Sequence, residues 1–235
     1  MSEAELQRLL KDLRREAGWE NTSGALAAAE AIADLPGDAP LLALVKELDR
    51  VDSIDLSDDA GDVGDEVART RYAVLGGLMR AGPRVAPVVF PLLHREHVTQ
   101  RNVTLATALA RLGHREVGPI VEAWITRPDT ELLTKIRLVE LLGLVASPNA
   151  RELIHALLRE PHEVNAGWLK RMSALALAHL QDVAGLEVLL DDEDWFARLG
   201  VMEACRHLRD ARAVAALRAR GATDLDERVR KAAAS

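Results

Sequence analysis

Apolar residues recur along the chain at the spacing of helices. Leu6, Leu9, Leu10 and Leu13 follow the i, i+3, i+4, i+7 rule of one helix face. We find no convincing stretch in which apolar and polar residues alternate, and β-branched residues occur mostly as short valine pairs. The pattern therefore predicts an all-α fold.

The helical pattern also repeats. Five segments end on an apolar residue directly before a short turn, and these anchor residues are Met79, Leu112, Val145, Leu180 and Leu208. Successive anchors are 28 to 35 residues apart, and apolar or small residues four and seven positions before each anchor complete one helix stripe. The small residues in the stripe should let neighbouring helices approach closely. A basic residue stands ten or eleven positions before each anchor, at Arg69, Arg101, Lys135, Lys170 and Arg198.

A second, shorter apolar helix is predicted after each turn, in 84–93, 116–125, 150–158, 183–190 and 211–219. One such pair cannot bury both of its faces, but a stack of pairs can, which defines a solenoid. We therefore expect a right-handed α-α superhelix of about six antiparallel helix pairs. The repeated basic residues are expected to pair with acids near neighbouring turns, such as Asp129, Asp191 and Asp192, and so to set the stacking.

The expected organisation is one continuous domain. It consists of an N-terminal capping helix in 1–20, a degenerate first repeat in 21–50, an acidic loop in 51–65 and repeats in 66–235. Ser23 is the expected N-cap of the first repeat, and residues 55–65 are expected to be irregular. The segment 223–235 reads as the first helix of a unit that stops early.

Composition narrows the class of protein. The chain has 235 residues, 30 basic and 37 acidic side chains and a net charge of −7, which argues against a general nucleic-acid binder. No apolar run is long enough for a membrane span, and no signal peptide is recognisable. The single cysteine, Cys205, excludes a cysteine-rich zinc site and is expected to pack as a small hydrophobe. A cytoplasmic protein is the expectation.

The acidic loop invites a calcium hypothesis through Asp55, Asp58, Asp59, Asp62, Asp65 and Glu66. Asp55, Asp59 and Glu66 fall on positions 1, 5 and 12 of an EF-hand loop, but Ala60 stands where that loop needs glycine. A solvated linker is favoured, and whether it binds a cation stays open.

The repeat resembles HEAT repeats, specifically the short HEAT-like units named after phycobilisome lyases. Residues 191–219, DDEDWFARLGVMEACRHLRDARAVAALRA, match best, and 101–121 follow. The resemblance extends over about 65–235 and loosely over 21–50. It implies an α-solenoid and gives almost no indication of catalytic or binding chemistry.

Three enzyme-like branches of that wider family carry recognisable residue patterns. The di-iron hydroxylases use repeated His-Glu dipeptides, and this chain has one, His162-Glu163. A single Glu152-x-x-His155 pair reads as a polar helix edge. The HEAT-like DNA glycosylases need a basic concave face with aromatic residues, whereas Trp124, Trp168 and Trp195 are expected to pack in the core. Nothing marks the bilin pocket of a phycobilin lyase.

The expected function is therefore a non-catalytic scaffold that binds another protein or a peptide, without cofactor or metal. The resemblance implies that the second helices line a concave face. Their exposed residues are Arg84, His94, Glu116, Glu122, Arg151, Glu152, His155, Arg159, Glu187, Arg212 and Arg218. Because the charges are of both signs, a protein partner is favoured over a polyanion.

Overall fold

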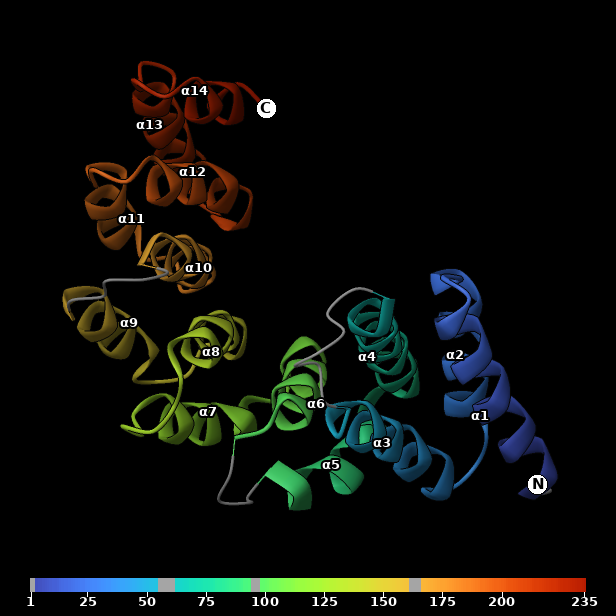
Figure 1. The fold of residues 1–235 in the computed structure, drawn as a ribbon. Helices are drawn as coiled ribbons and strands as arrows, with labels where there is room; N and C mark the ends of the chain where they lie inside the picture. Colours follow the sequence, from blue (N-terminus) through green and yellow to red (C-terminus); the bar gives the residue numbers. More distant parts are fainter. Residues whose placement is uncertain (1–2, 55–61, 94–97, 161–165) are drawn as a thin grey trace. The chain divides into compact units, whose positions relative to one another are not determined.

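The fold of this chain is entirely helical where it is described. The computed structural model describes residues 3–54, 62–93, 98–160 and 166–235, and all regular structure there is helical, which confirms the all-α class (Figure 1). None of these helices is both long and apolar enough to cross a membrane. The chain divides into two compact units, unit 1 (Met1–His114) and unit 2 (Arg115–Ser235), where the sequence predicted one continuous domain.

The helices follow the predicted repeat. Unit 1 contains α1 (Glu3–Gly18), α2 (Thr22–Asp34), α3 (Ala39–Asp52), α4 (Asp62–Ala81), the 3-10 helix η1 (Gly82–Val85), α5 (Ala86–Leu93) and α6 (Gln100–Arg111). Unit 2 contains η2 (Arg115–Val117), α7 (Gly118–Ile125), α8 (Leu132–Val145), α9 (Ala150–Arg159), α10 (Ala166–His179), α11 (Val183–Leu190), α12 (Trp195–Ala204), η3 (Cys205–His207), α13 (Ala211–Gly221) and α14 (Glu227–Ala233). Each predicted first helix ends close to its anchor, and α11 coincides with the predicted 183–190.

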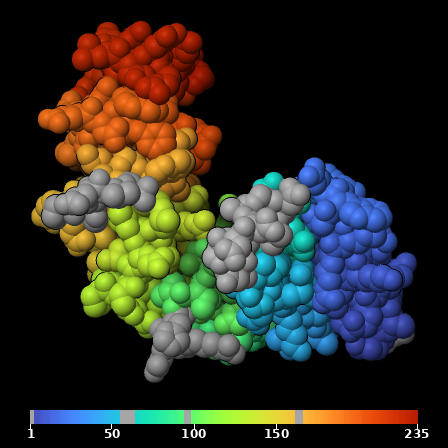
Figure 2. Space-filling model, in the orientation of Figure 1, coloured from blue at the N-terminus to red at the C-terminus, as the bar shows by residue number. Residues whose placement is uncertain are grey.

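The helices of the repeat form two sets that alternate along the chain. We call α2, α4, α6, α8, α10, α12 and α14 the first helices, and α3, α5, α7, α9, α11 and α13 the second helices. In unit 2, α10 packs directly on α8 and α12, whereas α9 and α11 each lie between two first helices. In unit 1, α2 packs on α4, and α4 packs on α6. The colours within unit 2 follow one another in sequence order in Figure 2, so each pair adjoins its sequence neighbours.

Glycine permits the close packing of first helices that the small residues predicted. A Cβ on Gly143 would lie 2.5 Å from Ala176 Cα, and one on Gly200 would lie 2.8 Å from Arg171 Cα. Both distances are far below van der Waals contact with backbone atoms. These positions therefore fix the spacing of α8, α10 and α12.

Side-chain caps and left-handed residues shape the turns. Asp182, Asp194, Asp210 and Asp226 cap α11, α12, α13 and α14 by accepting backbone N–H hydrogen bonds. Helix α2 is capped by Asn21 rather than by the expected Ser23. The residue directly after the anchors Leu112, Val145 and Leu180 is left-handed, with φ of 80° at Gly113, 47° at Ala146 and 58° at Gln181. The last two are unfavourable positions for residues with a Cβ.

Ion pairs connect the repeated basic residues to neighbouring turns. Lys170 Nζ lies 2.8 Å from Asp192, as predicted, and Arg198 Nε lies 2.7 Å from Asp224. Arg101 pairs with Asp49 at 2.5 Å. Two basic positions depart from the expectation: Arg69 donates to the Ala17 carbonyl at the end of α1, and the described residues supply no ion pair for Lys135.

The N-terminal helix is fixed to unit 1 by a buried carboxylate. Helix α1 packs on α2 and α4, and Arg14 Nε donates to Glu47 Oε2 at 3.0 Å. Glu47 is only 3% exposed and also accepts from Arg50 at 2.9 Å. Burial raises the pKa of Glu47, but the two guanidinium hydrogen bonds outweigh it, so the pKa is lowered and the carboxylate stays ionised.

The acidic segment is shorter than the sequence predicted. Helix α3 extends to Asp52 and α4 begins at Asp62, so 62–65 is helical and not irregular. A helix can begin here because acidic side chains in the first turn interact favourably with the helix dipole.

Candidate functional site

Arg84, the first candidate of the predicted binding face, forms hydrogen bonds with the end of α2 and the turn between α2 and α3 of the preceding helix pair. It lies in η1, and its guanidinium donates to the carbonyls of Ala33 at 3.2 Å, Leu35 at 2.9 Å and Gly37 at 3.1 Å. Carbonyls at the end of a helix lack partners within the helix. Arg84 thus satisfies the end of α2, which is a structural role.

Glu122 has the same kind of role in unit 2. From α7 it accepts hydrogen bonds from the Ser147 hydroxyl, from Asn149 Nδ2 at 2.9 Å and from Asn149 N at 3.3 Å. Burial raises its pKa, but these hydrogen bonds outweigh that effect and lower the pKa. Glu122 therefore binds the turn between α8 and α9 as an ionised acceptor.

Arg151 and His155 contact the next turn along the row. His155 Nε2 lies 3.0 Å from Asp182 Oδ2, and Arg151 lies 3.3 Å from the same oxygen and donates to the Leu180 carbonyl at 3.1 Å. The other oxygen of Asp182 accepts from Gly185 N and caps α11. One carboxylate thus joins α9 to α11.

Several predicted face residues remain exposed on the second helices or beside them. They are Glu116, Glu152, Arg159, Glu187 and Arg212. Arg159 donates to the His155 carbonyl of its own helix at 3.1 Å. Arg218, by contrast, is half-buried beside the Cys205 thiol. His94 lies outside the described residues.

The acidic candidates are only partly described. Asp55, Asp58 and Asp59 lie outside the described residues, as does the side chain of Asp62. Asp65 is exposed on the first turn of α4, and Glu66 lies 3.5 Å from Arg50. Within the described ranges, no three His, Cys, Asp or Glu side chains cluster as metal ligands would.

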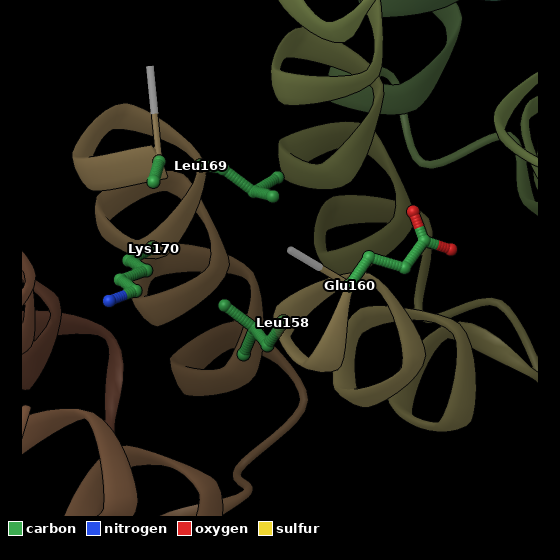
Figure 3. Close-up of a pocket in the computed structure, with 5 residues that line it drawn as sticks. Leu158, Glu160, Leu169 and Lys170 are labelled. Carbon is green, nitrogen blue, oxygen red and sulfur yellow. The ribbon is translucent and has the colours of Figure 1, made fainter. Parts of the chain in front are cut away.

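Two pockets among the described residues are candidates for ligand sites. One, of about 170 Å³, lies between α9 and α10 and is lined by Leu158, Glu160, Ala166, Leu169 and Lys170 (Figure 3). Its lysine is already paired with Asp192. The other, of about 350 Å³, lies between α1 and α3 over Leu6, Leu10 and Leu42, with the Arg14–Glu47 pair among its lining residues. Neither pocket brings together a nucleophile and a base.

The tryptophans divide between core and surface. Trp124 is 2% exposed, as predicted, but Trp168 is 50% exposed and contacts the Phe196 ring at 4.9 Å between centroids. The Arg228 guanidinium stacks 3.2 Å from the Trp195 ring centroid. Sequence reasoning placed Trp168 and Trp195 in the core. The sequence carries no consistent signal for this exposure: Leu133 and Trp168 each stand twelve positions before an anchor and are exposed, but Val67 at the same position is buried.

Sequence reasoning also missed that three arginines gather at the α12–α13 turn. Arg206, Arg209 and Arg212 are all exposed within one short segment. The His207 ring in this segment stacks on His179 of α10, with ring centroids 4.3 Å apart. The signal was present in the sequence RHLRDAR, which spans 206–212.

Comparison with known proteins adds no family assignment: no family model matches the chain, and no curated protein matches it in sequence.

Proposed function

We propose that the chain is a non-catalytic scaffold that binds another protein or a peptide, built as a right-handed α-α superhelix of HEAT-like helix pairs. The observation that carries the proposal is a repeated contact: a side chain of one helix pair forms a hydrogen bond with the turn of a neighbouring pair. Arg84 in unit 1, and Glu122, Arg151 and Gln181 in unit 2, each contact the turn of a neighbouring pair. Such a row buries its core by stacking and leaves a long surface for a partner.

The contacts within unit 2 involve both sets of helices. First helices pack directly on one another along the row, and the second helices α11 and α13 also contact each other. The proposal therefore keeps the face that the resemblance implies, which is the second-helix face with the exposed side chains of Glu152, Arg159 and Glu187.

The chemistry of the described side chains supports binding over catalysis. Glu122, His155 and Asp182, which could act as acid, base or ligand, each hold a turn of a neighbouring pair. The surface carries charges of both signs, which suits a protein partner and specificity in register. The lone, buried Cys205 is in keeping with a reducing, cytoplasmic location.

The alternatives are a DNA glycosylase-type nucleic-acid binder and a phycobilin-lyase-like chaperone or lyase. The first would need a basic face with an acidic catalytic group among aromatic residues. Trp168 is the most exposed aromatic residue of α10 and α12, but Arg171 beside it is already paired with Glu203 at 2.7 Å. No described feature favours the second alternative.

The test combines partner capture with metal analysis. Affinity purification of the full chain from its native host should recover one protein in a fixed ratio, and the purified chain should hold no stoichiometric transition metal. The second-helix changes Arg159→Glu and Glu187→Lys keep net charge constant and should reduce the recovery of the partner if it binds the predicted face. Two equivalents of iron, or turnover of a DNA substrate, would contradict the scaffold.

A further inference from the structure

The most concentrated unpaired charge in unit 2 is the arginine group of the α12–α13 turn. Arg206, Arg209 and Arg212 are exposed, and the described residues offer none of them a carboxylate within ion-pair distance. The acid between them, Asp210, is already used, because its carboxylate accepts from Arg212 N at 2.8 Å and Ala213 N at 3.3 Å to cap α13. The Asp210 carboxylate is therefore directed at the N-terminus of α13 and does not form an ion pair with the three arginines.

Two histidines extend this arginine group toward the neighbouring helix pair. His179, at the end of α10, and His207, in η3, are half-buried and stack with centroids 4.3 Å apart and ring planes at 40°. Arg206 Nε donates to His207 Nε2 at 3.1 Å, so that nitrogen is an unprotonated acceptor. The Glu140 carboxylate of α8 acts to raise the pKa of His207, but burial and Arg206 outweigh it.

Two hydrogen bonds of the Gln181 side chain fix the backbone of the segment 207–209. Its Nε2 donates to the His207 carbonyl at 2.9 Å, and its Oε1 accepts from Arg209 N at 2.8 Å. The backbone between His207 and Arg209 is thereby fixed to the turn after α10. The arginines thus project from a fixed backbone, which lowers the entropic cost of binding.

We propose that Arg206, Arg209 and Arg212, with the stacked His179 and His207, form a docking patch for a carboxylate-rich peptide segment of a protein partner. The proposal rests on the scaffold function and names a site and a partner chemistry for it. Guanidinium groups bind carboxylates through paired hydrogen bonds. The histidines add a second property: a bound polyanion favours their charged form, so binding takes up protons and tightens as the pH falls.

A peptide is favoured over a nucleic acid at this patch. Three arginines on one turn match a short acidic cluster, whereas the phosphates of a strand extend over many residues. Asp210 stands between Arg209 and Arg212 and limits the length of uninterrupted positive charge, which a longer phosphate strand would need.

The test is fluorescence anisotropy with labelled probes on the full chain. The probes are an oligoglutamate peptide of about 12 residues, its oligolysine counterpart and an oligothymidylate of similar charge. Oligoglutamate should bind, should weaken with added salt and should bind several-fold more tightly at about pH 6 than at about pH 8, since its carboxylates stay ionised throughout. Oligolysine should not bind.

Three sets of variants test the assignment. Arg206→Glu with Arg209→Glu should weaken oligoglutamate binding about tenfold or more. Arg115→Glu with Arg137→Glu changes net charge equally elsewhere in unit 2, at exposed arginines outside the predicted face, and should leave the affinity nearly unchanged. His179→Gln with His207→Gln should keep binding at about pH 8 and lose the gain at about pH 6.

The outcomes separate the patch from the scaffold function. Equal loss in both arginine pairs would overturn the patch, because binding would then follow net charge alone, and the scaffold would still stand. Persistence of the pH gain without the histidines would overturn their assignment to the patch. Tighter binding of oligothymidylate than of oligoglutamate would overturn both the patch and the choice of a protein partner.

Discussion

The backbone of Gly143 in α8 passes so close to Ala176 in α10 that a Cβ would lie 2.5 Å from Ala176 Cα and 2.8 Å from its carbonyl oxygen. Both are backbone atoms, so neither can turn aside as a side chain could. The only relief is a movement of α8 away from α10. The distance between these two first helices is therefore fixed at a glycine.

Gly143→Ala should consequently destabilise the protein. We expect a loss of about 2 kcal/mol in the free energy of unfolding, measured by urea denaturation, because overpacking forces backbone shifts. Gly18→Ala is the control, since a Cβ at this last residue of α1 meets no atom within 4 Å. It should leave stability unchanged or slightly raised. Equal behaviour of the two variants would contradict the close approach.

Asp182 should contribute more to stability than an ordinary helix cap. Its carboxylate caps α11 through Gly185 N and also contacts His155 and Arg151 of α9. Asp182→Ala should cost about 2 kcal/mol, since it removes the cap and leaves His155 without its partner. Asp210→Ala removes a cap alone and should cost about 1 kcal/mol. Equal losses in chemical denaturation would mean that the contacts between the pairs contribute nothing.

The helix pairs could be predicted from the sequence because their signals are local. The apolar stripe before Val145 and the segment 183–190 each carry the helical period, and the corresponding helices match. The left-handed turns could not be predicted in full: Gly113 is a typical residue for such a turn, whereas Ala146 and Gln181 are not.

The roles of the candidate site residues depended on tertiary contacts and were less predictable. The Lys170–Asp192 pair followed from regular spacing of opposite charges. Arg84 could not be assigned, because its partners are backbone carbonyls of the preceding pair, and no side-chain pattern marks them. The exposure of Trp168 was missed because a large apolar residue at the start of an apolar helix reads as core.

Stability should fall in mild acid because of the stacked histidines. Burial, His207 and Arg206 lower the pKa of His179, and burial and Arg206 lower that of His207, against the ordinary value of 6.5. The unfolded chain therefore binds protons first, so the stabilisation is complete above about pH 6.5 and is lost as the pH falls through the lowered folded values. The melting temperature should be lower at about pH 5 than at about pH 7.5.

A histidine variant separates this effect from general acid sensitivity. His207→Gln keeps a hydrogen-bonding side chain but cannot become charged, and it removes the repulsion that His179 would meet on protonation. The fall in melting temperature between the two pH values should be smaller in this variant than in the native chain. An undiminished fall would assign the acid sensitivity to other groups.

The ion pair of Arg198 with Asp224 should be worth far more than a surface pair, because both side chains are largely buried. They are 14% and 8% exposed, and the guanidinium contacts the carboxylate through Nε at 2.7 Å and Nη2 at 3.0 Å. Arg198 also donates to the Asp192 and Glu193 carbonyls, so its loss leaves the largely buried Asp224 carboxylate and the part-buried Asp192 carbonyl without this donor. Arg198→Met should therefore cost about 3 kcal/mol of unfolding free energy.

The matched surface change is Lys231→Met. Lys231 pairs with Glu227 at 2.8 Å on α14, but the two side chains are 76% and 67% exposed, so water can replace each partner. Its removal should change stability by less than about 0.5 kcal/mol. The double variant Arg198→Met with Asp224→Ala should lose less than the sum of the two single losses, because the uncompensated charge is gone. Additive losses in urea denaturation would mean that the two groups do not interact, and that the connection between α12 and α14 depends on apolar packing alone.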